Sequence, residues 1–134
     1  WPNGWHVRRE LSGFPFADLG VQFLTDWVAA DPEERAAALA DVIGPPSGQF
    51  SNLHAELLEK FDTYGVGHAF YASFMSGSWI GPASGWTRSK LEVARQWLDD
   101  ARPVVRDWAS NIVRSLQEEL KRNEAREAEE RFFL

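Results

Sequence analysis

The sequence predicts an all-α protein built from helical hairpins, and three observations support this class. Apolar residues recur at steps of three and four along most of the chain. Prolines and glycines gather between these stretches, most clearly at Gly44-Pro45-Pro46. The 134 residues are 44% apolar and include seven tryptophans, which is enough material for a hydrophobic core.

Each expected helix has a local reason. Residues 1–15, with two prolines and two glycines, predict an extended lead-in, and residues 16–134 predict a single all-α domain. The apolar stripe from Phe16 to Val28 predicts the first helix. Asp31 is the expected N-cap of the second helix, which should end at Gly44.

Ser51 is the expected N-cap of a third helix that ends near Phe61. Asp62-Thr63-Tyr64-Gly65 should make the turn, and the partner helix should run from His68 to Met75. Gly65 and Gly67 weaken this helix, because a glycine costs up to about 1 kcal/mol relative to alanine inside a helix. A third hairpin follows. We expect its first helix to begin near Trp86 with Ser84 as its cap, and its second helix to begin at Pro103.

The stretch from residue 86 to residue 120 resembles one HEAT repeat. It combines an apolar first helix, the acidic turn Asp99-Asp100, and the run Pro103-Val104-Val105-Arg106-Asp107-Trp108-Ala109. The resemblance implies a short α-solenoid of about three repeats that binds proteins, peptides or occasionally nucleic acid, with no catalytic residues. In this pattern we expect Arg106 to pair with an acid such as Asp100. The run from Ser76 to Trp86, followed by this hairpin, also resembles C-terminal helical segments of some large bacterial multidomain proteins. The start of the sequence at Trp1 suggests a piece of a longer protein.

Motifs for catalysis or metal binding are missing. With no cysteine, thiol chemistry and disulfides are excluded. His6, His54 and His68 form no i, i+4 pair, so we expect no metal, and we expect His68 to be half-buried against a turn. No Gly-x-Ser-x-Gly elbow and no phosphate-binding glycine loop occur. We therefore expect a protein without cofactors that is not an enzyme.

The glycine-rich loop from Ser76 to Trp86 is the best candidate for a binding surface. Trp79 and Trp86 could plug the groove between the second and third hairpins, or they could anchor a partner. Arg88 and Arg95 lie beside them in the sequence. The charged final helix carries a thin apolar stripe, and its tip, Phe132-Phe133-Leu134, is expected to dock on another surface.

Together these features predict an interaction, scaffold or sensor module that binds a protein or another domain of its parent chain. The alternative is a nucleic-acid-binding helical solenoid, which the net charge of −6 disfavours. A homo-oligomer could form through the C-terminal helix. The sequence shows no signal peptide and no apolar run long enough to span a membrane, so we expect a cytoplasmic protein without membrane contact. Arginine outnumbers lysine by 11 to 3 and alanine is abundant, which suggests a bacterial gene.

Overall fold

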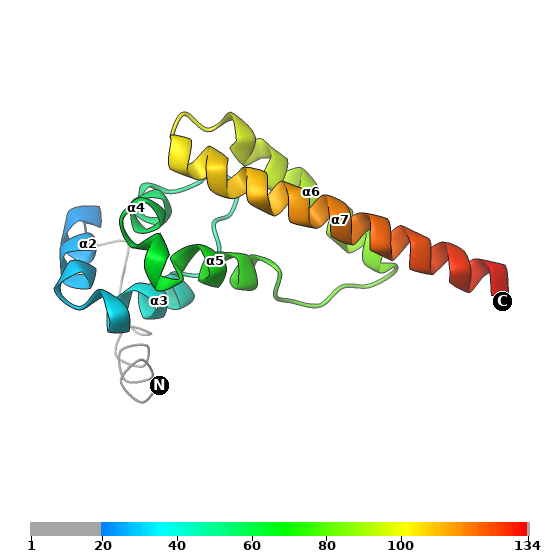
Figure 1. Ribbon diagram of the computed structural model, residues 1–134, viewed down its shortest axis with the longest axis horizontal. Coiled ribbons are helices and arrows are strands. Elements are labelled where there is room, and N and C mark those ends of the chain that lie inside the picture. The colour runs from blue at the N-terminus through cyan, green and yellow to red at the C-terminus, as the bar shows by residue number, and fades with distance from the viewer. Residues whose placement is uncertain (1–19, 134) are drawn as a thin grey trace. The chain divides into compact units, whose positions relative to one another are not determined.

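The computed structural model describes residues 20–133, and within that range its helices are joined by loops and no strand occurs. This confirms the all-α class. The chain divides into two compact units, one ending at Met75 and one beginning at Ser76. Figure 1 colours the first unit from blue to green and the second from green to red. The prediction of one domain over residues 16–134 and the stacking of its hairpins as a solenoid stay predictions.

The described part of the first unit, residues 20–75, holds four α-helices and a 3-10 turn. They are α2 (Val21–Ala30), α3 (Pro32–Ile43), α4 (Asn52–Phe61), η2 (Asp62–Tyr64) and α5 (Val66–Phe74). Its core is fully buried and combines one or two large side chains from each helix. These include Val28, Leu39, Leu57 and Phe70. The predicted apolar stripes face inward at these positions, but Phe23, which belongs to the predicted stripe of the first helix, is exposed. The predicted residues 16–19 of that helix lie outside the described range.

The predicted caps of the first unit have different outcomes. Ser51 caps α4 as expected, because its Oγ accepts the backbone N–H of His54 at 3.1 Å. Asp31 occupies the N-cap position of α3, but its side chain accepts no hydrogen bond there. Helix α5 begins at Val66, two residues earlier than predicted. Gly65 adopts the left-handed conformation (φ 86°) that makes this early start possible.

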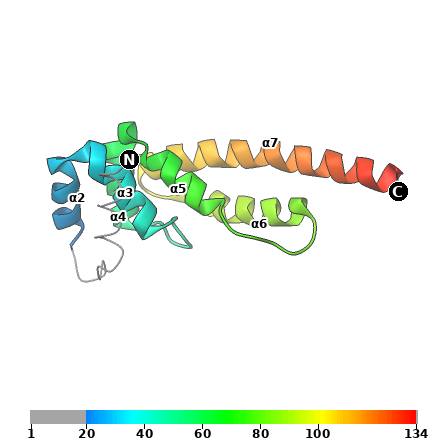
Figure 2. The ribbon, with the colours of Figure 1, turned by 90° about the horizontal axis from the view of Figure 1, so that it is seen from below.

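The second unit is a helical hairpin. It contains α6 (Ala83–Gln96), the 3-10 turn η3 (Trp97–Asp99) and α7 (Pro103–Phe133), which lie side by side in both ribbon views (Figures 1 and 2). Near the turn the interface is apolar, with Leu91 and Ala94 of α6 buried among residues of α7 that include Val105, Ala109 and Leu116. Trp97 and Trp108 meet there with ring centroids 5.7 Å apart. Leu98 and Leu120 are only partly buried.

The hairpin turn is held by one aspartate and two arginines. The Asp100 carboxylate accepts two hydrogen bonds from the Arg102 guanidinium, both at 2.8 Å. Arg106 donates to the backbone carbonyl of Asp100 at 2.8 Å. Arg106 therefore meets Asp100 as predicted, but at the main chain, because the nearer Arg102 occupies the carboxylate. This bidentate contact lowers the pKa of Asp100 to about 2.

Candidate interaction surface

An exposed aromatic surface lies where the Ser76–Pro82 loop joins α6. Trp79 stacks on Trp86, with ring centroids 4.8 Å apart and an interplanar angle of 28°. The Lys90 ammonium lies 5.7 Å from the centroid of the Trp86 ring. Trp79 is 47% exposed, and the neighbouring Ile80 is fully exposed. We call Trp79, Ile80, Trp86 and Lys90 the tryptophan patch.

The chain reaches this arrangement through two glycines and a proline. Gly77 (φ 123°) and Gly81 (φ 95°) adopt conformations that side chains disfavour, so the loop can bend on both sides of Trp79. Pro82 follows with extended geometry and occupies the N-cap position of α6. Trp86 and Lys90 are four residues apart and therefore lie on one side of that helix.

The start of α6 is fastened by α7. The backbone N–H of Ser84 donates to Oε1 of Glu127 at 3.1 Å, and hydrogen bonds from Ser84 lower the pKa of Glu127. Ser84 is therefore not the N-cap that its sequence position suggests, because α6 begins at Ala83 and a carboxylate from the neighbouring helix satisfies the amide. One turn further along, the Thr87 hydroxyl donates to Oδ1 of Asn123 at 2.7 Å. Both of these side chains are almost completely buried.

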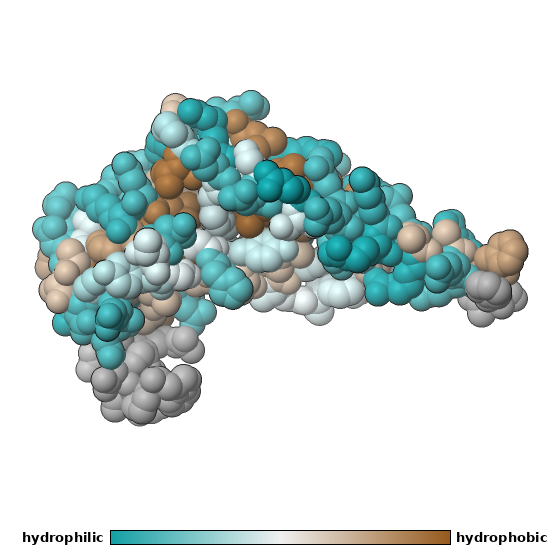
Figure 3. All heavy atoms as spheres, in the orientation of Figure 1, coloured by the Kyte–Doolittle hydropathy of each residue, from teal (hydrophilic) through white to brown (hydrophobic). Residues whose placement is uncertain are grey.

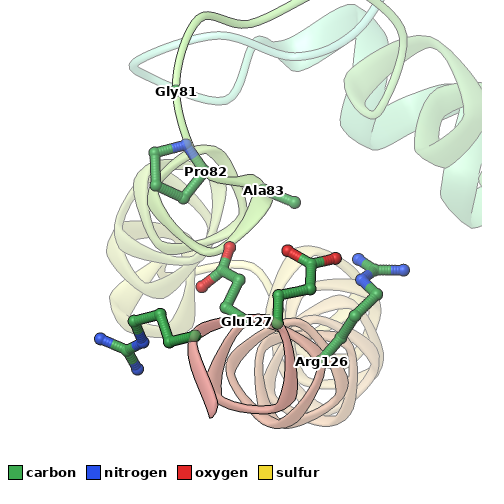
Figure 4. Close-up of a pocket in the computed structure, with 7 residues that line it drawn as sticks. Gly81, Pro82, Ala83, Arg126 and Glu127 are labelled. Carbon is green, nitrogen blue, oxygen red and sulfur yellow. The ribbon is translucent and has the colours of Figure 1, made fainter. Parts of the chain in front are cut away.

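A shallow groove of about 510 Å³ lies beside this contact, between the loop and the C-terminal half of α7. Figure 4 shows carboxylates of α7, including that of Glu127, between the two helices, with Pro82 and Ala83 above them. Arg126 and Arg131 complete its charged lining. The opposite charges are mixed within the groove, which gives it no clear preference for an anion or a cation.

The two predicted arginines do not belong to the tryptophan patch. Arg88 is two residues from Trp86, which places it about 200° around the helix axis. Arg88 lies 3.9 Å from Glu124 of α7, and Arg95 is exposed in the last turn of α6. Successive residues of a helix point in different directions, so closeness in the sequence gave a misleading grouping.

The predicted tip is the exposed end of α7. Phe132 is 83% exposed. The helix includes Phe133, whose side chain lies outside the described part of the structure, as does all of Leu134. Figure 3 shows hydrophobic spheres at this end of the helix, next to hydrophilic ones.

One histidine has a structural role that sequence analysis missed. His54 is half-buried and connects two loop residues through its ring nitrogens. Its Nε2 lies 3.0 Å from the backbone oxygen of Gly44, and its Nδ1 lies 2.6 Å from Oγ of Ser51. Its ring packs on Phe70, with centroids 4.8 Å apart, and burial lowers its pKa. His68, expected to be half-buried, is exposed instead. Within residues 20–133, no three His, Asp or Glu side chains gather as metal ligands would.

No family model matches the chain, and no curated protein or solved structure matches it. Among the helices that the structure describes, none combines the length and apolar character needed to cross a bilayer.

Proposed function

We propose that this protein is a non-catalytic interaction module whose second unit binds a protein partner, or another domain of a parent chain, through the tryptophan patch. The observation that carries the proposal is the exposure of Trp79 and Ile80 on a rigid support. Exposed tryptophans are enriched at the centres of protein interfaces, where removing them commonly costs more than 2 kcal/mol.

The support of the patch is as important as its exposure. Trp79 is held by its stacking on Trp86, and α6 is held by the buried Thr87–Asn123 contact and by Glu127. A ring that is already oriented loses little conformational entropy on binding. Ile80, the next residue along the chain from Trp79, is fully exposed and adds an aliphatic side chain to the patch. The partner that suits this patch presents an apolar segment and a carboxylate that can meet Lys90.

The alternative is a nucleic-acid-binding solenoid. An aromatic ring beside a lysine can stack on an unpaired base. Residues 76–134 nevertheless contain ten acidic and ten basic residues, so this unit supplies no net positive charge to hold a phosphate backbone. Protein recognition is therefore the better supported of the two.

The test is affinity capture from a source lysate, followed by titration of each captured protein with the purified chain. Trp79→Ala and Ile80→Ser should each weaken binding at least about tenfold. Phe23→Ala is the matched control, because Phe23 is also a large exposed side chain (58%) but lies on α2 in the first unit. Equal loss in all three variants, or none in the two patch variants, would contradict the proposal. Salt-sensitive binding of single-stranded nucleic acid would favour the alternative.

A further inference from the structure

Helix α7 is much longer than its partner in the hairpin. It spans 31 residues against 14 for α6. The Ser84–Glu127 hydrogen bond places the start of α6 beside Glu127, so α7 continues past α6 by more than one turn (Figures 1 and 2). The end of α7 is therefore without a helical neighbour in its own unit.

A narrow seam runs along the face of α7 that points away from α6. Lys121, Ala125, Ala128 and Phe132 follow at steps of four, three and four, and all four are exposed. Ala125 lies two residues from the buried Asn123, about 200° around the helix, so the seam and the α6 interface occupy opposite faces. A second helix could therefore pack on the seam without displacing α6.

The charges that flank this seam are complementary to a second copy in one orientation. Suppose that two α7 helices cross antiparallel with Ala125 opposite Ala128 and Lys121 opposite Phe132. Arg122, which also contacts Glu119 of its own helix at 2.6 Å, then faces Glu129 of the second copy on one side of the seam. Glu124, which lies 3.9 Å from Arg88 of α6, faces Arg131 of the second copy on the other side. The two-fold symmetry repeats both pairs, so four oppositely charged pairs form and no like-charged pair does. An in-register parallel arrangement would instead set Glu124 against Glu129.

We propose that the seam of α7 is a self-association surface on which two copies of this chain pair antiparallel. The inference goes beyond the proposed function, because it uses a different face of the unit from the tryptophan patch. Phe132 of each copy covers the aliphatic stem of the opposite Lys121, and Ala125 and Ala128 let the two backbones approach. The overlap is short, so we expect a weak dimer with a Kd of about 0.1–1 mM.

The first experiment is sedimentation equilibrium of the whole chain across the concentration range around that Kd. Glu129→Arg sets two arginine pairs against each other and should weaken the dimer at least about tenfold. The charge exchange Arg122→Glu with Glu129→Arg restores both pairs and should recover most of the affinity. Arg114→Glu is the matched control, because Arg114 lies on the same side of α7 but outside the overlap. Circular dichroism of each variant checks that α7 stays helical.

The chain has no cysteine, so single introduced cysteines can report the orientation. In the antiparallel pairing the two Ala125 positions are offset by three residues, or about 4.5 Å along the helix, while the two Lys121 positions are offset by about 16 Å. Ala125→Cys should therefore form a disulfide-linked dimer under mild oxidation, and Lys121→Cys should not.

Three results would overturn the proposal. One is a chain that stays monomeric throughout the concentration range. Another is a dimer in which Glu129→Arg has no more effect than the Arg114→Glu control, or in which the charge exchange recovers nothing. The third is equal cross-linking at positions 121 and 125, which would show a parallel pairing. None of these results bears on the tryptophan patch, so the two proposals can fail separately.

Discussion

The buried hydrogen bond between Thr87 and Asn123 allows a quantitative test of how the second unit is stabilised. Thr87 is 1% exposed and Asn123 is 2% exposed, and their side-chain oxygens lie 2.7 Å apart. Thr87→Val keeps the shape of the side chain but removes the donor. The Asn123 carbonyl oxygen is then buried without this partner, which should lower the free energy of unfolding by about 1–3 kcal/mol.

The reverse substitution should cost less. In Asn123→Leu the Thr87 hydroxyl can turn to the carbonyl of the preceding helical turn, so we expect a loss of about 1 kcal/mol. The double variant buries two apolar side chains against each other and leaves neither group unpaired. Its stability should lie within about 1 kcal/mol of the original chain, and it could exceed it. With a double variant as stable as the original chain, the coupling between the two sites is about 2–4 kcal/mol.

Urea denaturation followed by far-ultraviolet circular dichroism measures these differences, and amide hydrogen exchange in α6 and α7 assigns them to the second unit. Ser89→Ala is a suitable control, because Ser89 is exposed on α6 and its hydroxyl donates only to the backbone oxygen of Gly85. The reasoning would be refuted if Thr87→Val cost less than about 0.5 kcal/mol, or if the losses of the single variants simply added in the double variant.

Three further predictions concern the turns and the pH dependence. The pKa of Asp100 falls from 3.8 to about 2 in the folded state, so its contribution is present above pH 3.8 and is lost as the pH falls through 2. After allowance for solvent screening, this contribution to the free energy of unfolding is about 1 kcal/mol. Asp100→Asn should therefore lower the free energy of unfolding by that amount at neutral pH, measured by urea titration, and should make stability depend less on pH below about 4. Burial lowers the pKa of His54 below 6.5, so the free energy of unfolding should decline as the pH falls below 6.5. His54→Gln should remove that part of the pH dependence. If the variant shows the same pH dependence as the original chain, His54 is not its cause. Gly65→Ala should lower the free energy of unfolding by about 1 kcal/mol in the same titration, because φ is 86° at this position. The cost is one of backbone conformation alone, since no atom lies within 4 Å of an added Cβ. An unchanged urea midpoint would show that the turn relaxes.

Much of the helical framework was predictable because its causes are local. The N-cap Ser51 acts on an amide three residues away, and the break at Gly44-Pro45-Pro46 needs no distant partner. The candidate site was predictable only in part. The glycine-rich composition around Trp79 indicated the loop, whereas the separation of Arg88 from Trp86 depends on the direction of side chains around α6.

Periodicity and caps in the sequence by themselves determined the all-α class, the break before α4 and the inward faces of the helices, because each depends on residues within about one helical turn. Only the tertiary structure decided how α6 begins and what lies at the polar end of the hairpin. Glu127 satisfies the amide of Ser84 across 43 residues, and Asn123 meets Thr87 across 36. Such contacts depend on the register between the two helices. The packing of the apolar side chains near the turn sets this register, and no local sequence pattern encodes it.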